Sequence, residues 1–423
     1  IIMANRNGGF IGTDGLDAPD PPTAVTPTAG NAQVSVAFTA PTDTGTSAIT
    51  GFVAQVSTDG TDYSAGSNTG TSSPIVVSSL TNDTAATAKV WAINAYGTSA
   101  PSDASASFSP LAPRIVFIGG NGLSGAGATA AVTMDYINPS STGNATDFGD
   151  LLNTGGYGGA RGSMSSTTRG LTHLGQNFGD GNRSNEVQYI TMASTGNGTD
   201  FGNLTQTCEE FPSAASNATR GLRAGGNASS SAPYVTDTID YCTIASTGNF
   251  SDFGNLTFGC FRDSSGCSSP TRAILTCGGV GEPSNNENVA SQSNIIQYVT
   301  IASTGNATDF GDMRSAREYN AASSDTRAVC YGTNGNTIDY FTIASTGNSA
   351  DFGNMETTKT DSTAGTNNTR GCWGGGRNTS SVIINNIEYL TVASLGNATD
   401  FGNLTIARSG GLTTPSGGHG GLQ

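Results

Sequence analysis

One phrase occurs six times after residue 113 of this 423-residue chain, and this repetition constrains the fold more than any other feature. The copies read MDYINPSSTGNATDFGDL, VQYITMASTGNGTDFGNL, IDYCTIASTGNFSDFGNL, IQYVTIASTGNATDFGDM, IDYFTIASTGNSADFGNM and IEYLTVASLGNATDFGNL. Their tyrosines are Tyr136, Tyr189, Tyr241, Tyr298, Tyr340 and Tyr389. The spacing is therefore about 50 residues, the length of one supersecondary unit that must stack on its neighbours to bury its apolar face.

Each copy predicts two strands of a four-stranded unit. Residues 239–244 alternate apolar and polar side chains, as a strand does, and Ser-Thr-Gly-Asn then predicts a tight turn in which Gly and Asn take positive φ. Phe-Gly-Asn-Leu predicts a second strand with Phe and Leu buried. Two more strands are predicted between copies. One is an apolar run that opens with Thr-Arg and ends in glycines, and the other is an upstream Ser/Ala-rich stretch such as ARGSMSS or EYNAASS. Four short strands per repeat are typical of a β-propeller blade.

The two ends of the repeat region predict how such a ring closes. Residues 114–120, RIVFIGG, lack the small-residue strand before them, and IARSGGLTTPSGG follows the sixth copy. We expect this C-terminal segment to pair into the first blade, which would hide the edges of an open sheet. The predicted domain is a six-bladed propeller over residues 113–423.

The double glycines and the aromatic pair Tyr189 and Phe201, with its equivalents, resemble the kelch family of propellers over about 310 residues. The chain departs from that family in having Phe where its blades usually have Trp, and in the TGNxxDFG segment. The resemblance implies architecture and no specific activity.

Residues 19–110 predict a separate all-β domain. Runs such as 33–38 and 49–54 alternate and are divided by Pro, Gly, Asp and Asn. Pro21-Pro22, Leu80 and the segment VWAINAYGTSAPS at 90–102 resemble a fibronectin type III sandwich. Phe38 stands where that family usually has a core Trp, and Ala86 where its corner Tyr would fall. No RGD tripeptide occurs, so integrin-type adhesion is not implied.

Composition excludes several classes of function. Lys and Arg number 17 against 32 Asp and Glu, a net charge of −15, so a nucleic-acid partner is not expected. No apolar run is long enough for a membrane helix, and the start shows no signal-peptide pattern, so we expect no membrane insertion. Ile1 and Ile2 precede a natural-looking Met3 start without explanation.

Cysteine and histidine usage predicts neither cofactors nor metals. Seven cysteines match no zinc spacing, and we interpret most as small buried hydrophobic residues, with a Cys260–Cys267 disulfide as an alternative. The cysteines are Cys208, Cys242, Cys260, Cys267, Cys277, Cys330 and Cys372. His173 and His419 are isolated, unlike the ligands of a kelch-type copper oxidase, and no sialidase Asp-box occurs. We predict no catalytic, cofactor-binding or metal-ligating residue and no enzyme.

Two repeated charged positions have a structural and a binding interpretation. We expect the repeated arginines to bridge to a neighbouring blade's Asp or carbonyls, with ligand binding as the alternative. They are Arg169, Arg220, Arg272, Arg327 and Arg370. We expect the Asp of each DFG to bond its own turn backbone, with calcium as the alternative, although one carboxylate per loop is few for that ion. These are Asp147, Asp200, Asp252, Asp309, Asp351 and Asp400.

Other surface features are less informative. Repeated Asn-X-Ser/Thr triplets begin at Asn144, Asn197, Asn203, Asn306, Asn397 and Asn403, and they predict glycosylation only on a eukaryotic secretory route. Trp373 and Tyr157 are candidate sugar-stacking aromatics or core residues, and the sequence does not distinguish the two.

The whole layout resembles structural proteins of marine tailed bacteriophages, particularly those that infect cyanobacteria. The features are MANRNGGFIGTDGLDAPDPP, a fibronectin-like module and STGNATDFGDL repeats. The resemblance implies a non-enzymatic virion surface protein, on the tail or as a capsid appendage. Residues 1–18 would anchor it to other virion proteins, and the propeller would face outward toward a host envelope glycan or protein, in a homo-oligomer. The alternatives are a purely architectural cement protein and a bacterial cell-surface adhesin or filament protein.

Overall fold

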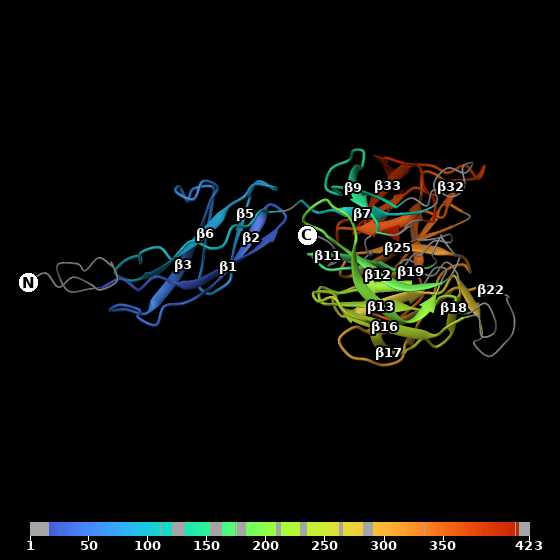
Figure 1. Ribbon diagram of the computed structural model, residues 1–423, viewed down its shortest axis with the longest axis horizontal. Coiled ribbons are helices and arrows are strands. Elements are labelled where there is room, and N and C mark those ends of the chain that lie inside the picture. The colour runs from blue at the N-terminus through green and yellow to red at the C-terminus, as the bar shows by residue number, and fades with distance from the viewer. Residues whose placement is uncertain are drawn as a thin grey trace, which may run out of the picture. The chain divides into compact units, whose positions relative to one another are not determined.

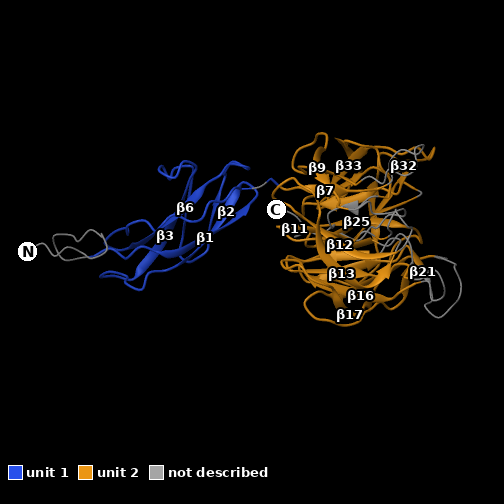
Figure 2. Cartoon of the chain, viewed as in Figure 1, with its two compact units in different colours: residues 1–112 blue, residues 113–423 orange. Residues whose placement is uncertain are grey.

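The computed structural model describes residues 17–110, 112–120, 132–152, 163–173, 175, 183–208, 213–228, 235–261, 265–281, 291–333, 335–410 and 412–413. The chain divides into two compact units, residues 1–112 and 113–423 (Figures 1 and 2). The described residues form antiparallel strands and contain no helix, which confirms the predicted all-β class. The division falls within the proline-flanked segment 110–113.

Unit 1 consists of two three-stranded sheets around one core. One has the order β1 (Thr23–Gly30), β2 (Gln33–Thr39), β5 (Ile75–Ser78), and the other β4 (Gly66–Gly70), β3 (Ile49–Ser57), β6 (Thr87–Asn94). Alternate residues of β2, β3 and β6 are buried, because successive side chains of a strand point to opposite faces. Phe38 takes part in this core and packs against Phe52, and Ala86 is buried beside them.

The segment 98–108 lies along β6 without forming a regular strand. The backbone N–H groups of Ser99, Ser102 and Ser105 donate to carbonyls of β6 at 2.8–2.9 Å. Their hydroxyl oxygens accept from the N–H groups of Ala92, Val90 and Ala88 at 2.9–3.0 Å. At every third residue of this segment, a serine hydroxyl thus accepts the hydrogen bond of a β6 N–H group that a backbone carbonyl would accept in a regular sheet.

Unit 2 contains six four-stranded sheets. The first has the order β35 (Leu412–Thr413), β7 (Ile115–Ile118), β8 (Thr133–Ile137), β9 (Thr146–Asp150), and the second β10 (Ser163–Ser165), β11 (Arg169–His173), β12 (Ser184–Thr191), β13 (Thr199–Cys208). The third is β14 (Ser213–Ser216), β15 (Arg220–Ala224), β16 (Thr238–Thr243), β17 (Ser251–Asn255), and the fourth β19 (Ser265–Ser268), β20 (Arg272–Thr276), β23 (Ile295–Thr300), β24 (Thr308–Asp312). The fifth is β25 (Tyr319–Ser323), β26 (Arg327–Gly332), β27 (Thr337–Thr342), β28 (Ala350–Asn354), and the sixth β30 (Thr363–Thr366), β31 (Arg370–Gly374), β33 (Asn386–Thr391), β34 (Thr399–Asn403).

Two smaller sheets accompany these six. They are β18 (Gly259–Phe261) with β21 (Gly279–Gly281) and β22 (Ser291–Gln292), and the pair β29 (Lys359–Thr360) and β32 (Arg377–Asn378). In the first four-stranded sheet, Leu412 and Thr413 pair with Ile118 and Phe117, so the C-terminal segment lies beside the start of the unit.

The first strands of successive sheets contact one another, and Figure 1 shows β19 and β25 toward the middle of unit 2 with β17 at its rim. Small side chains allow this approach: a Cβ on Gly266 would meet the Ala214 carbonyl oxygen. Buried serine hydroxyls join the strands, since Ser216 donates to the Ser165 carbonyl at 3.0 Å and Ser268 to the Ser216 carbonyl at 2.7 Å. The Ser/Ala-rich stretches are therefore strands, as predicted.

The predicted tight turn at Ser-Thr-Gly-Asn is wrong. The chain reverses earlier, where for example the Ser194 N–H bonds the Thr191 carbonyl at 3.3 Å. The TGN asparagines have no positive φ, whereas the TGN glycine has a φ of +155° to +159° in every repeat except that of Gly196. This segment runs extended because its amides bond a neighbouring sheet, as described next.

Candidate functional site

The repeated phrase builds a seam between neighbouring sheets. In each repeat the TGN glycine N–H donates to the DFG phenylalanine carbonyl of the preceding repeat at 2.7–3.1 Å. The TGN asparagine Oδ1 accepts from the amide two residues after that phenylalanine at 3.0–3.1 Å. The sixth sheet makes the same bonds to the first, from Gly143 N–H to the Phe401 carbonyl and from Asn403 N–H to Asn144.

The repeated arginines take the carbonyl-bridging role expected of them. Arg169 donates to the Ile244 carbonyl of the next repeat at 3.1 Å, and its guanidinium lies 4.6 Å from the centre of the Tyr189 ring in its own sheet. The equivalent pairs are Arg220 with Tyr241, Arg272 with Tyr298, Arg327 with Tyr340 and Arg370 with Tyr389. Arg114, which opens the first RIVFIGG run, is a sixth member that was not predicted: it donates to the Met192 carbonyl at 3.0 Å, and its guanidinium lies 4.9 Å from the centre of the Tyr136 ring.

The expectation that each DFG aspartate bonds its own turn is wrong. All six side chains are exposed, and the TGN asparagine of the next repeat bonds the local amide instead. Within the described part of the chain, Asp351 is the one of these six that makes an ion pair, with Arg314 at 2.8 Å. Among the described residues, no group of three or more His, Cys, Asp or Glu could hold a metal ion.

A second set of polar residues, one before each repeated tyrosine, escaped the sequence analysis. Each is buried and accepts a hydrogen bond from the residue four places after the preceding DFG phenylalanine. The acceptors are Asp135, Gln188, Asp240, Gln297, Asp339 and Glu388. Their donors are Thr405, Leu152, Thr205, Thr257, Arg314 and Glu356. A buried oxygen acceptor recurring at the repeat period is the signal that would have found them.

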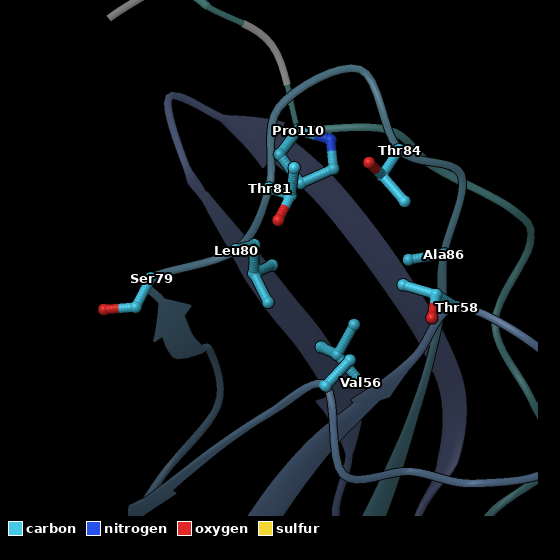
Figure 3. A pocket seen from close by; sticks show the side chains of 9 residues that line it. Val56, Thr58, Ser79, Leu80, Thr81, Thr84, Ala86 and Pro110 are labelled. Atoms are coloured by element: carbon cyan, nitrogen blue, oxygen red, sulfur yellow. The ribbon is translucent and has the colours of Figure 1, made fainter.

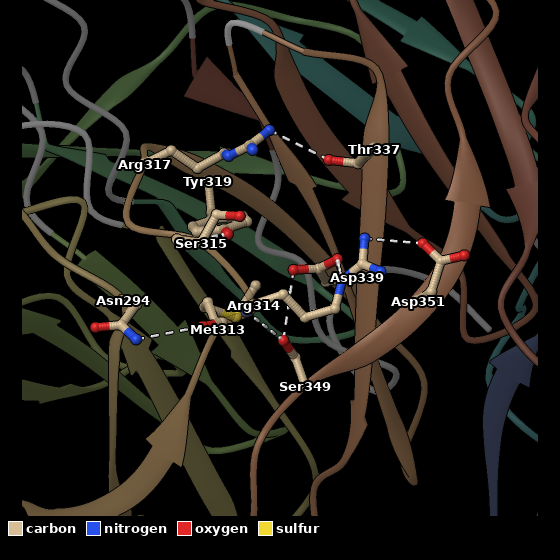
Figure 4. Close-up of polar contacts among 10 residues, drawn as sticks. All are labelled: Asn294, Met313, Arg314, Ser315, Arg317, Tyr319, Thr337, Asp339, Ser349 and Asp351. Carbon is tan, nitrogen blue, oxygen red and sulfur yellow. Dashed lines mark hydrogen bonds and ion pairs between the residues drawn. The ribbon is translucent and has the colours of Figure 1, made fainter.

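Figure 4 shows the fifth of these sites. Arg314 Nε donates to Asp339 Oδ1 at 2.7 Å, and Ser349 lies 3.4 Å from the other carboxylate oxygen. Asp339 is nearly buried, whereas Asp351 on the far side of Arg314 is exposed. Arg314 thus contacts a buried and an exposed carboxylate and joins the end of the fourth sheet to the fifth sheet.

Three fully buried basic side chains lie near these acceptors. Arg408 pairs with Asp135 at 2.6 Å, Lys359 with Glu388 at 3.4 Å, and Arg223 contacts the Cys208 sulfur. Burial lowers the pKa of Arg408 and of Lys359, and it raises the pKa of the Cys208 thiol and of Asp240. These groups are enclosed between sheets and present no open surface to a ligand.

His173 is fully buried and isolated from any metal-binding group in the described part of the chain. Burial, with the positive charge of Arg223, lowers its pKa to about 3, so the ring is neutral at physiological pH. Its Nε2 lies 3.0 Å from the Ser184 carbonyl, which requires the proton on Nε2. His419 lies outside the described residues.

The alternative Cys260–Cys267 disulfide is wrong, because Cys260 pairs with Cys277. This bond joins β18 to the end of β20, whereas Cys267 points into the core between the fourth and fifth sheets. Cys208, Cys242, Cys267, Cys330 and Cys372 are free and buried, as predicted for most cysteines. Burial raises the thiol pKa of Cys242, Cys267 and Cys372 to about 12, so these thiols are unreactive.

Trp373 is fully buried and donates to the Asn320 carbonyl at 3.1 Å, so it is a core residue; Tyr157 lies outside the described residues. Unit 1 contains a small hollow of about 60 Å³, shown in Figure 3. Its lining includes Leu80, Thr81, Thr84 and Pro110 and no ionisable side chain. It has room for little more than water.

Comparisons with known proteins identify no family. No protein-family model matches the chain, and no curated protein matches it. One matching solved structure is the crystal structure of domains A168-A170 from titin, with 26% sequence identity and a TM-score of 0.22 over 23% of this chain. The chain covers 33% of that titin chain. No helix in the described ranges is long and apolar enough to cross a membrane.

Proposed function

We propose that the chain is a non-enzymatic structural protein of a phage virion surface, on the tail or as a capsid appendage. Unit 1 is a fibronectin type III-like sandwich that acts as a spacer, and unit 2 is a six-bladed kelch-like propeller that faces the host envelope. Residues 1–18, of which 1–16 lie outside the described residues, anchor the protein to other virion proteins. The protein acts at the particle surface as a homo-oligomer.

The observation that carries this proposal is that the repeated polar groups form hydrogen bonds between repeats. The TGN asparagines, the repeated arginines and the buried acceptors before each tyrosine all bond the neighbouring repeat. A motif that repeats because it holds a scaffold together leaves recognition to the segments that differ between repeats. The bonds from the sixth sheet to the first support a closed ring, which protects strand edges in an extracellular particle.

Cryo-electron microscopy of intact particles that contain this chain tests the proposal. We expect density for a six-bladed disk and a small β-sandwich on a phage head or tail. A few to tens of copies at a tail tip would support attachment, whereas a copy number near that of the major capsid protein would support the cement alternative. Finding the chain in a cell-surface filament without capsid or tail proteins would overturn the virion assignment.

A further inference from the structure

Three departures from the repeat meet at one place in the sixth sheet. Glu388 is the only glutamate among the six buried acceptors, and Asn386 is the only asparagine two residues before such an acceptor. Lys359 is one of only two lysines in the sequence. Residues that break a repeat and converge in space carry a role that the repeat itself does not require.

One carboxylate oxygen of Glu388 contacts both of the other groups. Lys359 Nζ lies 3.4 Å from Glu388 Oε1, and Asn386 Nδ2 donates to the same oxygen at 2.8 Å. Asn386 and Glu388 lie two apart on β33, so their side chains project from the same face. Lys359 reaches them from β29, in the connection between the fifth and sixth sheets.

The surroundings suit chemistry that needs an uncharged amine. The side chains of Lys359 and Glu388 are 0% and 1% exposed. Burial lowers the pKa of Lys359, which favours the neutral and nucleophilic amine. The Asn386 Oδ1 atom is buried and has no hydrogen-bond partner, and in the proposed product it would remain as the carbonyl oxygen of the new amide.

We propose that Lys359 and Asn386 form an intramolecular isopeptide bond, with Glu388 relaying the proton. The Lys359 Nζ lone pair attacks Asn386 Cγ and forms a new C–N bond. Glu388 takes a proton from Nζ and delivers it to Nδ2, the atom that it already contacts. The Cγ–Nδ2 bond breaks and ammonia leaves, so a lysine amine and an asparagine amide become one amide and ammonia. No oxidant or cofactor takes part.

Intact mass spectrometry of the purified, denatured full chain tests this proposal. We expect the mass to be lower than that of the sequence by one molecule of ammonia. A tryptic digest should contain residues 328–370, uncleaved at Lys359, joined to residues 378–408. The full sequence mass in the wild-type chain would overturn the proposal and leave an ordinary ion pair. Ammonia loss that maps to another asparagine would overturn it as well.

Variants separate the roles of the three residues. Glu388→Gln and Lys359→Arg should each restore the full mass, because one lacks the proton relay and the other the nucleophile. Lys89→Arg is the matched control, since Lys89 lies in unit 1 over the Tyr63 ring, and it should keep the ammonia loss. The wild-type measurement decides by itself where a variant fails to fold.

Discussion

At the scale of single residues, the glycine of each DFG is required both by its own positive φ and by the close approach of the neighbouring repeat. Gly202 has φ +143°, and a Cβ there would lie 2.4 Å from the Gly248 carbonyl oxygen of the next repeat. The same approach recurs at Gly149, Gly254, Gly311, Gly353 and Gly402. Close packing of the seam therefore depends on the absence of a side chain at this position.

Gly202→Ala should destabilise the chain by about 1–3 kcal/mol, because the new methyl group adds a steric clash to a strained φ. Gly196→Ala is the control: it has an extended backbone and no atom within 4 Å of its Cβ position. We expect its effect to be within about 0.5 kcal/mol. Urea denaturation of both variants measures the difference, and equal stabilities would contradict the assigned packing.

His173 should make stability depend on pH in a definite direction. Its folded pKa of about 3 lies below the ordinary histidine pKa of 6.5, so above pH 6.5 both states are neutral and stability does not change. Below pH 6.5 His173 binds a proton in the unfolded chain but stays neutral in the folded chain. The free energy of unfolding therefore falls as the pH drops to about 3.

Replacement of this ring removes the dependence. Relative to its value at pH 7.5, the stability difference between wild type and His173→Gln should change by about 3 kcal/mol at pH 4.5. Urea unfolding at both pH values measures it. Parallel stability–pH curves for the two proteins would show that His173 titrates normally.

At the scale of elements, the serines at 99, 102 and 105 show how an irregular segment completes a sheet edge. Ser102 uses its N–H to bond the Val90 carbonyl and its hydroxyl to accept from the Val90 N–H. Its hydroxyl also donates to the Asp103 carbonyl at 2.8 Å. One small residue thus satisfies both backbone groups of a buried strand position.

Ser102→Ala should cost about 1–3 kcal/mol, because the Val90 N–H would remain buried without an acceptor. Ser107→Ala changes an exposed serine of the same segment and should be nearly neutral. Thermal unfolding of both variants, with hydrogen exchange at Val90, compares them. Unchanged protection of the Val90 amide in Ser102→Ala would contradict the assigned bond.

At the scale of the whole second unit, a buried ion pair adds to the backbone contacts between its two ends. Arg408 bonds Asp135, 273 residues earlier, at 2.6 Å, and it also donates to the Thr133 carbonyl at 2.8 Å. Both side chains are at most 3% exposed. Either charge left alone would be uncompensated in a low-dielectric interior.

Arg408→Ala should therefore destabilise unit 2 by about 3–5 kcal/mol, and the double variant Asp135→Asn/Arg408→Met by clearly less than the sum of its parts. Arg377→Ala is the control, because Arg377 and Asp361 are 3.6 Å apart and about one third exposed. We expect it to cost at most about 1 kcal/mol. Additive effects of the two buried changes in a denaturation cycle would contradict the pairing.

Predictions from the repeat succeeded where they depended only on the residue pattern within a single strand. Alternation identified the buried Phe201 and Leu204 and the four strands of each sheet, because strand periodicity is a local property. The bridge from the repeated arginines to carbonyls of a neighbouring repeat was predicted correctly, whereas other predictions about turns and side-chain partners failed. Asn197, Asp200 and Cys260 are examples, since their bonds or exposure depend on chain segments that local sequence does not place.

The sequence by itself determined the all-β class, the six-fold repetition and the burial of most cysteines, because composition and period suffice for these. Only the tertiary structure decided which residues meet across the seams. The TGN asparagines, the buried acceptors before each tyrosine, Arg114, and Lys359 with Glu388 acquire their roles from neighbours about 30 to several hundred residues away. Such pairings follow from how the sheets stack, which no single repeat encodes.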